Sequence, residues 1–239
     1  CADARTPSRR RPALGVGFVV NKVVSSCPIF ASSAEMISLS GRTAALRFRF
    51  GTTSYFAVVH YAPTSRHLAS VRQHALDEVE DILGQRKAHE ILAMAGDWNA
   101  SIGGNTVADD HVCGPHGNPR LNPAGLQLRG LLARHQLCAP VTFTRNTFPG
   151  TWTHPASHTQ HQIDHFFVHR HTARSVRECI NAVPLVNSDH LSVRLHLHPD
   201  PPLPPRPKSI RSRRARLHHA HGFCGAADLD KSLRSAISV

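Results

Sequence analysis

The residues best suited to chemistry follow a short apolar run, in Gly96-Asp97-Trp98-Asn99. The run, residues 91–94, predicts a strand, so Asp97 and Asn99 should lie at its carboxyl end. A carboxylate there can activate a water molecule, and a carboxamide two residues later can orient that water or hydrogen-bond an oxyanion. An isolated Gly-Asp-x-Asn is also typical of a turn, because turns favour these residue types. The motif therefore needs partners before it indicates a site.

Two later pieces of the chain supply such partners. Asp164 precedes the apolar stretch 166–168, and Asp189-His190 precedes an alternating pattern at residues 191–197. A lone aspartate before a strand is also typical of a cap or turn. If Asp164 lies near His190, its carboxylate can fix the tautomer and orientation of the imidazole. Asp189 and His190 should have different roles, because adjacent side chains on an extended chain point in opposite directions.

A tyrosine closes the preceding strand in a similar way. The apolar run at residues 55–59 leads into His60-Tyr61-Ala62-Pro63, so Tyr61 should emerge at the same edge as Asp97. Its hydroxyl can donate a hydrogen bond to a phosphate oxygen. A buried tyrosine before a proline turn would give the same pattern. Tyr61 therefore joins the candidate site only if the two strands end side by side.

The elements that must position these residues are predicted by periodicity. Apolar residues recur at helical spacing in 68–83 and 124–136, which predicts two helices packed on a sheet. Alternating or continuous apolar runs predict six strands, at residues 14–20, 44–50, 55–59, 91–94, 166–168 and 191–197. The strand at 55–59 should be covered on both sides. Many strands with only two helices, which do not alternate regularly, favour an α/β fold of stacked sheets with helices outside and disfavour a Rossmann layout.

Composition favours a polyanionic partner. The 239-residue chain has 28 Lys and Arg against 16 Asp and Glu, a formal charge of +12. Nucleic acid is the first partner class that such a charge suggests, and anionic lipid the second. The charge is concentrated in the first 11 residues and in 206–216, which is also typical of solvated arms. We expect three parts: a basic segment 1–13, a folded domain 14–198, and a Pro-rich, basic and disordered tail 199–239.

Histidine, cysteine and hydropathy patterns bear on three questions: a transition-metal site, the redox compartment and a membrane span. Six histidines between His154 and His171 lack carboxylate or cysteine partners, so we interpret them as a variable loop rather than a transition-metal centre. The six cysteines are scattered without a Cys-x-x-Cys pair, which suits a reducing compartment and predicts a nuclear or cytoplasmic location. No apolar run approaches the ~18 residues of a membrane span, so no membrane partner is expected.

Five short motifs occur in order, each next to a predicted strand end. They are Tyr61-Ala62-Pro63, Gly96-Asp97-Trp98-Asn99, Thr151-Trp152, Ile163-Asp164-His165 and Ser188-Asp189-His190. In this order they resemble the endonuclease/exonuclease/phosphatase superfamily, most closely the apurinic-type endonuclease domain of non-LTR retrotransposons. Gly15-Val16-Gly17-Phe18 and Gly114-Pro115-His116-Gly117 also look like those elements and the craniofacial-development-protein-2-like sequences derived from them. The resemblance covers roughly residues 14–198.

The resemblance implies a two-sheet α/β sandwich and hydrolysis of a phosphodiester. By the family pattern, Asp97 would orient or deprotonate the attacking water, and Asn99 would hydrogen-bond the water or the phosphate. Tyr61 would contact the phosphate. His190 would hold the phosphoryl oxygens and stabilise the developing charge, while Asp164 would fix the imidazole and keep it cationic. Such a division of roles suits phosphoryl transfer, which depends chiefly on positioning and charge neutralisation.

The resemblance also implies a metal and a substrate surface. Mg²⁺ would be the cofactor, with Mn²⁺ as a substitute, and Asp189 would contribute to the metal site. Thr151 and Trp152 would contact the substrate. Mg²⁺ prefers oxygen ligands and keeps several waters, so few protein ligands suffice.

One expected ligand is missing from the matching positions. Family members carry an Asn and a metal-ligating Glu on two strands upstream of the segment matched by residues 15–20. Only 14 residues precede Gly15, and none of them is Glu. Glu35 lies after that segment, so the role is not transferred to it. We therefore expect a fold that lacks its first strands, with apolar faces open and activity feeble or absent in this chain.

The sequence thus favours a DNA-nicking endonuclease domain of a retroelement, impaired in this chain, with a reverse transcriptase downstream in the full-length polypeptide. Two alternatives stay open. One is a non-catalytic nucleic-acid-binding remnant, in which the basic tail from Arg206 supplies salt-sensitive affinity. The other is a phosphoinositide-type phosphatase on the same fold.

Overall fold

A computed structural model describes residues 15–104, 111–184 and 187–198 of the chain. The predicted basic segment 1–13 and the predicted tail 199–239 lie outside the described residues. None of the described helices is long and apolar enough to cross a membrane.

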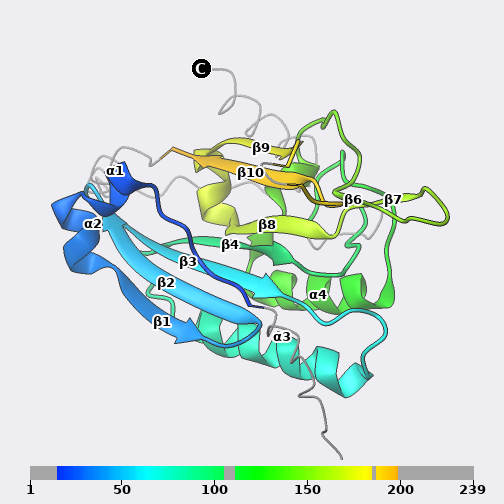
Figure 1. Ribbon diagram of the computed structural model, residues 1–239, viewed down its shortest axis with the longest axis horizontal. Helices are drawn as coiled ribbons and strands as arrows, with labels where there is room; N and C mark the ends of the chain where they lie inside the picture. Colours follow the sequence, from blue (N-terminus) through cyan, green and yellow to red (C-terminus); the bar gives the residue numbers. More distant parts are fainter. Residues whose placement is uncertain (1–14, 105–110, 185–186, 199–239) are drawn as a thin grey trace, which may run out of the picture.

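A six-stranded sheet forms the centre of the fold, with the strand order β1-β2-β3-β4-β8-β5 (Figure 1). Its strands are β1 (Glu35–Leu39), β2 (Thr43–Phe50), β3 (Thr53–Tyr61), β4 (Ile91–Asp97), β8 (Asp164–His169) and β5 (Leu137–Cys138). Only β3 and β4 pair in parallel, and the other neighbours are antiparallel. This mixed α/β fold confirms the predicted class and the strands expected at 44–50, 55–59, 91–94 and 166–168.

The strand register brings three predicted site residues together. Tyr61 is the partner of Asp97 in the parallel pair, and Asp97 is the partner of Asp164 in the antiparallel pair. The carboxyl ends of β3 and β4 and the amino end of β8 therefore meet at one edge of the sheet. We call the edge where Tyr61, Asp97 and Asp164 lie side by side the acidic edge.

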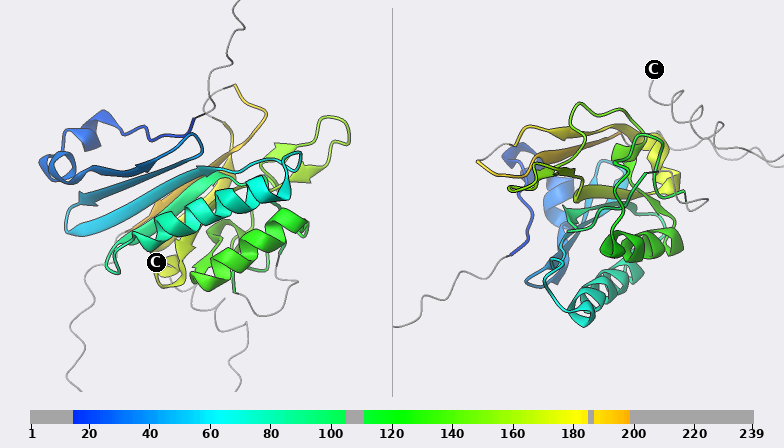
Figure 2. Two further views of the ribbon diagram at one scale, coloured as in Figure 1. Left: turned by 90° about the horizontal axis from the view of Figure 1, so that it is seen from below. Right: turned by 90° about the vertical axis from the view of Figure 1, so that its right-hand side faces the viewer.

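Two helices cover one face of the central sheet. They are α3 (Ala69–Gly84) and α4 (Pro123–Arg134), which lie side by side beneath the strands (Figures 1 and 2). Both confirm predicted helices. The side chain of Asn122 caps α4 by accepting a hydrogen bond from the Gly125 amide at 2.7 Å. The helices bury the side chains that alternate strand residues direct toward them, among them Phe56, Val58, Leu92, Met94 and Phe167.

The other face is covered only in part. The strands β9 (Val176–Ala182) and β10 (Ser192–Leu197) pair as a separate two-stranded sheet, which packs on β8 (Figure 1). Tyr55, Ala57 and Val59 on β3 consequently stay half-exposed on this face, while Phe56 and Val58 are buried on the other. The expectation that β3 is covered on both sides was wrong, because the second sheet of the described structure does not extend that far.

The chain before β1 also differs from the prediction. Residues 15–21 form no regular structure, so the strand expected at 14–20 was wrong over its described part. The apolar alternation there is not matched by a neighbouring strand, and Val19 is fully exposed. Short elements complete the described fold: α1 (Lys22–Ser25), α2 (Pro28–Ser33), η1 (Pro140–Thr142), β6 (Trp152–Thr153), β7 (Gln160–His161) and η2 (Arg170–Ser175).

Candidate functional site

The glycine before Asp97 lets β3 and β4 approach closely at the acidic edge. A Cβ atom on Gly96 would lie 1.8 Å from the backbone oxygen of His60, so no larger residue fits without moving the strand. Asp97 is the last residue of β4, and its backbone oxygen accepts a hydrogen bond from the Ala62 amide at 2.8 Å. The chain thereby fixes where the Asp97 carboxylate leaves the sheet.

The segment after Asp97 is a turn and also part of the site. Asp97 Oδ1 accepts a hydrogen bond from the Asn99 amide at 2.9 Å, as in an Asx turn. Asn99 has a φ of 45°, a left-handed conformation that asparagine tolerates, and its Nδ2 donates to the Ala62 carbonyl at 2.9 Å. Trp98 between them is buried in the core. The two interpretations of the motif are therefore compatible, because the turn is what presents both polar side chains.

His190 and Asp164 form an ion pair at the acidic edge. Nδ1 of His190 lies 2.9 Å from Oδ2 of Asp164. This hydrogen bond is the main cause that raises the pKa of His190 above its ordinary value, and the Coulomb attraction of Asp164, Asp97 and Asp189 adds to it, against partial burial. The imidazole therefore favours its charged form, and the predicted pairing of the two residues is confirmed.

Thr151 holds these two partners in place. Its hydroxyl oxygen accepts hydrogen bonds from the amides of Ile163 and Asp164 at 3.2 and 3.1 Å, and its carbonyl accepts one from the Leu191 amide at 2.7 Å. The side chain is buried. The prediction that Thr151 contacts substrate does not fit this burial, and its contacts place it behind Asp164 and His190.

Two carboxylates and the imidazole form one cluster. Ligand atoms of Asp97, Asp164 and His190 all lie within 4.8 Å of one another. Burial raises the pKa of Asp97 from 3.8 to about 6, and the negative charges of Asp164 and Asp189 add to this shift, while His190 and the Asn99 amide oppose it. A divalent cation would relieve this repulsion, and carboxylate oxygens are the ligands that Mg²⁺ prefers. The described residues therefore fit a cation at the acidic edge.

Asp189 and Trp152 lie beside this cluster. Trp152 Nε1 donates a hydrogen bond to Asp189 Oδ2 at 3.1 Å, and a single antiparallel β-bridge joins Trp152 to His190. Asp189 and His190 thus have different hydrogen-bond partners, Trp152 and Asp164. Its carboxylate is not one of the three clustered ligands. The predicted roles of Asp189 in metal binding and of Trp152 in substrate binding stay predictions.

Sequence reasoning missed two supporting contacts. The guanidinium of Arg42 lies 5.4 Å from the ring centroid of Tyr61, and its Nη1 donates to the Tyr61 carbonyl at 3.3 Å. Gln162 is buried, and its Nε2 donates to the Asp164 carbonyl at 2.6 Å, while its amide also pairs with Asn181 on β9. No motif marks Arg42 or Asn181, because only the sheet register brings them near the site.

Glu35 takes no part in the site. It lies at the start of β1, and its carboxylate forms an ion pair with Arg47 at 3.2 Å. Arg47 is the register partner of Phe56 on β3, which lies five residues before Tyr61 and the acidic edge. Within the residues that the structure describes, no glutamate belongs to the cluster.

Several solved structures are similar to this chain. The chain is similar to the endonuclease domain of TRAS1, a telomere-specific non-LTR retrotransposon, with 15% identity over 69% of this chain and 68% of that domain and a TM-score of 0.48. It is also similar to the 3′ phosphatase NExo from Neisseria, with 14% identity, 66% and 65% coverage and a TM-score of 0.46. A third similar structure is the AP endonuclease LMAP from Leishmania major, with 13% identity over 67% of this chain and 56% of that chain and a TM-score of 0.48.

The alignments thus span about two thirds or less of the NExo and LMAP chains. No curated protein matches. The model of the endonuclease/exonuclease/phosphatase family matches residues 8–190, which is most of the chain. The chain therefore belongs to the endonuclease/exonuclease/phosphatase family.

Proposed function

We propose that the acidic edge hydrolyses phosphodiester bonds in DNA with a divalent cation, Mg²⁺ or in its place Mn²⁺. The observation that carries this proposal is the cluster of Asp97, Asp164 and His190, which the strand register assembles from three distant segments. Family membership supports a hydrolytic role for the cluster.

Each side chain has a definable task in this reaction. Asp97, with a pKa near 6, is poised to orient the attacking water and accept its proton close to neutral pH. His190, kept cationic by Asp164, is suited to bind phosphoryl oxygens and to neutralise the charge that develops on them. Asn99 Nδ2 donates to the Ala62 carbonyl at 2.9 Å and to Asp97 Oδ2 at 3.4 Å, so its amide oxygen is the group that can orient the water.

The cation would be held by carboxylate oxygens at the acidic edge, with Asp189 as the predicted ligand. When bound, it would supply Lewis-acid stabilisation of the phosphoryl oxygens. Tyr61 lies next to Asp97 in the register, where its hydroxyl can contact a phosphate oxygen. Because no described glutamate completes the site, we expect turnover to be slow.

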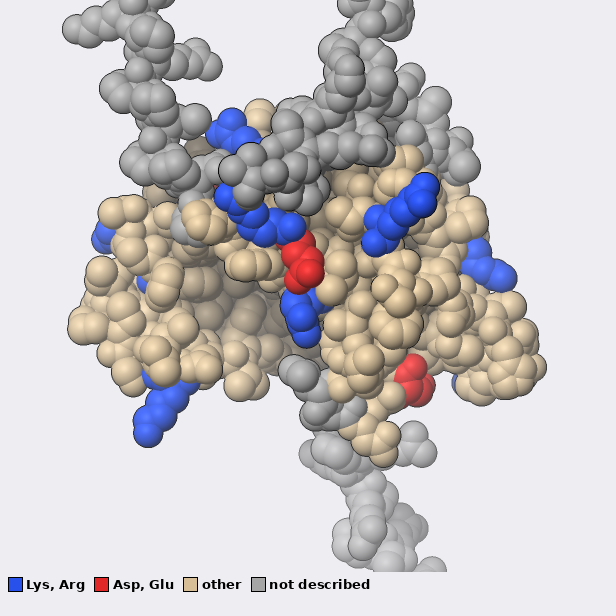
Figure 3. Space-filling view, turned by 90° about the horizontal axis from the view of Figure 1, so that it is seen from above, with Lys and Arg blue, Asp and Glu red and all other residues tan. Residues whose placement is uncertain are grey.

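The charge of the chain supports DNA as the substrate. The net charge is +12, and basic side chains are spread over the face on which β9 and β10 lie, with isolated acidic groups among them (Figure 3). Such a surface attracts a polyanion and positions its phosphates. The half-exposed indole of Trp152 lies beside His190 and can stack on a base.

A nicking assay on supercoiled plasmid tests the proposal. With the 239-residue chain in excess over plasmid and Mg²⁺ or Mn²⁺ present, we expect slow nicking that EDTA abolishes. Asp97→Asn should lower the rate at least about 100-fold, because proton transfer of this kind contributes about 10²–10⁴-fold. Absence of nicking, or nicking that Asp97→Asn leaves unchanged, would contradict the proposal.

The same preparation separates the two alternatives. A phosphoinositide-type phosphatase would release phosphate from soluble inositol phosphates faster than it nicks plasmid. A non-catalytic nucleic-acid-binding remnant would retain plasmid without nicking it, and the retention would survive Asp97→Asn.

A role in a retroelement is the finer part of the proposal. The similarity of the ordered motifs to non-LTR retrotransposon domains supports it. The coding sequence downstream of these residues tests it: a reverse transcriptase in the same reading frame is the expected result, and an unrelated frame would contradict it.

A further inference from the structure

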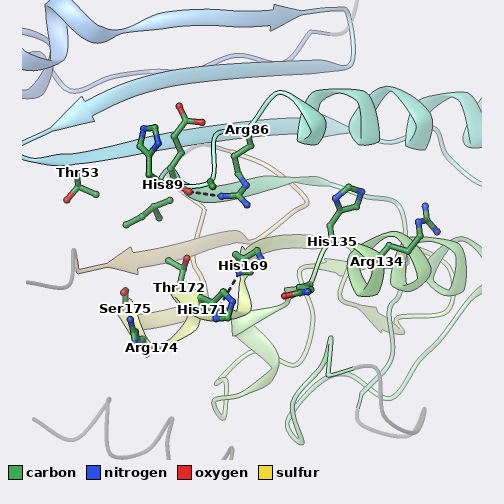
Figure 4. Close-up of a pocket in the computed structure, with 14 residues that line it drawn as sticks. Thr53, Arg86, His89, Arg134, His135, His169, His171, Thr172, Arg174 and Ser175 are labelled. Atoms are coloured by element: carbon green, nitrogen blue, oxygen red, sulfur yellow. Dashed lines mark hydrogen bonds between the residues drawn. The ribbon is translucent and has the colours of Figure 1, made fainter. Parts of the chain in front are cut away.

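A second charged site lies at the opposite end of β4 from Asp97. It is a pocket of about 530 Å³ formed by the loop between α3 and β4, the end of α4, and η2 (Figure 4). Three guanidinium groups line it, those of Arg86, Arg134 and Arg174. Four imidazoles also line it, those of His89, His135, His169 and His171. We call this the basic pocket.

The acidic group that lines the basic pocket is already neutralised. Glu90 is buried, and one carboxylate oxygen is in contact with Nε of Arg47. The other accepts a hydrogen bond from the Lys87 amide at 2.7 Å. Glu80 pairs with Arg134 and His135 from outside the pocket, and its own carboxylate does not line the pocket. Among the described residues that line the pocket, cationic side chains therefore outnumber carboxylates.

Arg86 is held rigidly at the wall of the pocket. Its Nη1 donates to the carbonyls of Glu90 and Lys87, at 2.9 and 3.3 Å. Both bonds use Nη1, so within the described part of the chain the Nε–H and Nη2–H groups keep donors for another acceptor. Figure 4 shows Arg86 on the β4 side of the pocket, facing the histidines of η2. A guanidinium held in this way needs little ordering before it binds an anion.

The two histidines opposite Arg86 are also pre-ordered. The rings of His169 and His171 stack with their centroids 4.8 Å apart. Nδ1 of His169 accepts a hydrogen bond from the His171 amide at 3.3 Å, so the neutral ring carries its hydrogen on Nε2. Burial lowers the pKa of His169, and the positive charges of Arg86, His171 and Arg170 lower it further. An anion between these groups would relieve their repulsion.

We propose that the basic pocket binds a phosphate-bearing anion at a site separate from the acidic edge. One guanidinium can donate two parallel hydrogen bonds to two oxygens of the same phosphate, and imidazole N–H groups add further donors. The pocket volume lies in the range of about 300–1,000 Å³ that small-ligand sites occupy. Six residue steps along β4 put the pocket about 20 Å from Asp97, too far for one phosphate to occupy both sites.

The phosphate has two conceivable sources, a free small anion such as pyrophosphate or a phosphate of a nucleic acid strand. Equilibrium dialysis with labelled pyrophosphate, in EDTA so that no metal bridges it to the acidic edge, measures the first. Displacement of the pyrophosphate by a short single-stranded oligonucleotide measures the second.

The test variant is the triple substitution His169→Asn, His171→Gln and Arg174→Gln. Asparagine at 169 keeps the N-cap acceptor of η2, and Arg86 is left alone because it holds the loop before β4. The matched control is Arg194→Gln, an exposed arginine on β10 that does not line the pocket. Circular dichroism confirms that each variant is folded.

We expect pyrophosphate to bind the wild-type chain and the Arg194→Gln variant equally, and the triple variant at least about tenfold more weakly. Displacement by the oligonucleotide would identify a nucleic acid phosphate as the source, and resistance to it a small anion. Equal binding to the wild-type chain and the triple variant, or no binding to the wild type, would overturn the proposal.

Discussion

Strand β4 has groups of opposite charge at its two ends. At its carboxyl end Asp97 lies beside Asp164 and near Asp189, and burial together with these charges raises its pKa to about 6. At its amino end the guanidinium of Arg86 faces His169, and burial together with this charge lowers the pKa of that imidazole. In both places the fold holds like charges together and favours the neutral form of one group.

The opposite charges at the two ends of β4 indicate which ion each end can bind. Like charges held together by a fold are relieved by an ion of opposite sign. The acidic edge therefore suits a cation, and next to it the protonated His190 suits a phosphate. The basic pocket suits an anion, and among its described lining residues the one carboxylate, Glu90, is already paired with Arg47. We therefore propose chemistry at the first end and binding alone at the second.

The largest expected effect is on plasmid nicking, when one histidine at each end of β4 is replaced in turn. His190→Ala removes the cationic group predicted to neutralise the phosphoryl oxygens, so plasmid nicking should fall about 100- to 1,000-fold. With the chain saturating the plasmid, so that DNA binding does not limit the rate, His169→Asn at the basic pocket should leave the nicking rate within about twofold of wild type. Gel quantification of open-circular plasmid measures both. A loss of nicking in His169→Asn would break the distinction between the ends.

Next in size is the buried ion pair behind the basic pocket. Glu90→Gln leaves Arg47 without its main counter-charge and keeps one oxygen where Arg47 and the Lys87 amide use two, so we expect the free energy of unfolding to fall by about 3 kcal/mol. Urea unfolding followed by circular dichroism measures the change. Glu78→Gln, on α3, provides the control and should change stability by less than about 0.5 kcal/mol. Similar losses in both variants would mean that the pair is not structural.

Asp164→Asn should sharpen the account of the acidic edge. Without the ion pair His190 loses the main cause of its raised pKa, so the alkaline limb of the pH–rate profile should move to lower pH. The rate at the optimum should fall about tenfold. Asp189→Asn is the comparison, because that carboxylate bonds Trp152 and should move the limb far less. An unmoved limb in Asp164→Asn would show that His190 is not the group that titrates.

The smallest effect concerns stability at the acidic edge. The folded-state pKa of Asp97 is raised from 3.8 to about 6, so its contribution to stability is fully present below about pH 4 and is lost as pH rises through 6. Asp97→Asn removes this loss and should raise the free energy of unfolding by on the order of 1–2 kcal/mol at about pH 8. In EDTA, the advantage should vanish near pH 4. A constant difference at all pH values would contradict the stated cause.

Much of the acidic edge could be predicted because strand ends leave local signals. Gly96 and the apolar run before it marked where β4 stops, and alternation marked β10. The pairing of Asp164 with His190 was a conditional prediction that the register fulfilled. Burial of Thr151 was not predictable, because its hydroxyl is used by amides of a segment that only folding brings near.

The basic pocket shows where sequence reasoning fails. Its residues come from three separate segments whose charges look like ordinary surface polarity, and the histidines near His169 were interpreted as a variable loop. The strand prediction at 14–20 was wrong for a different reason. Alternation of apolar residues indicates a strand only if a neighbouring strand is available to pair with it. Residues 15–21 have no such neighbour in the described structure.

The most direct test of the central claim, that the two ends of β4 select ions of opposite sign, is paramagnetic broadening of histidine resonances by Mn²⁺. His190→Gln and His169→Asn assign the two signals. We expect substoichiometric Mn²⁺ to broaden the His190 signal strongly and the His169 signal, about 20 Å away, far less. Equal broadening of both signals, or broadening of His169 alone, would contradict it.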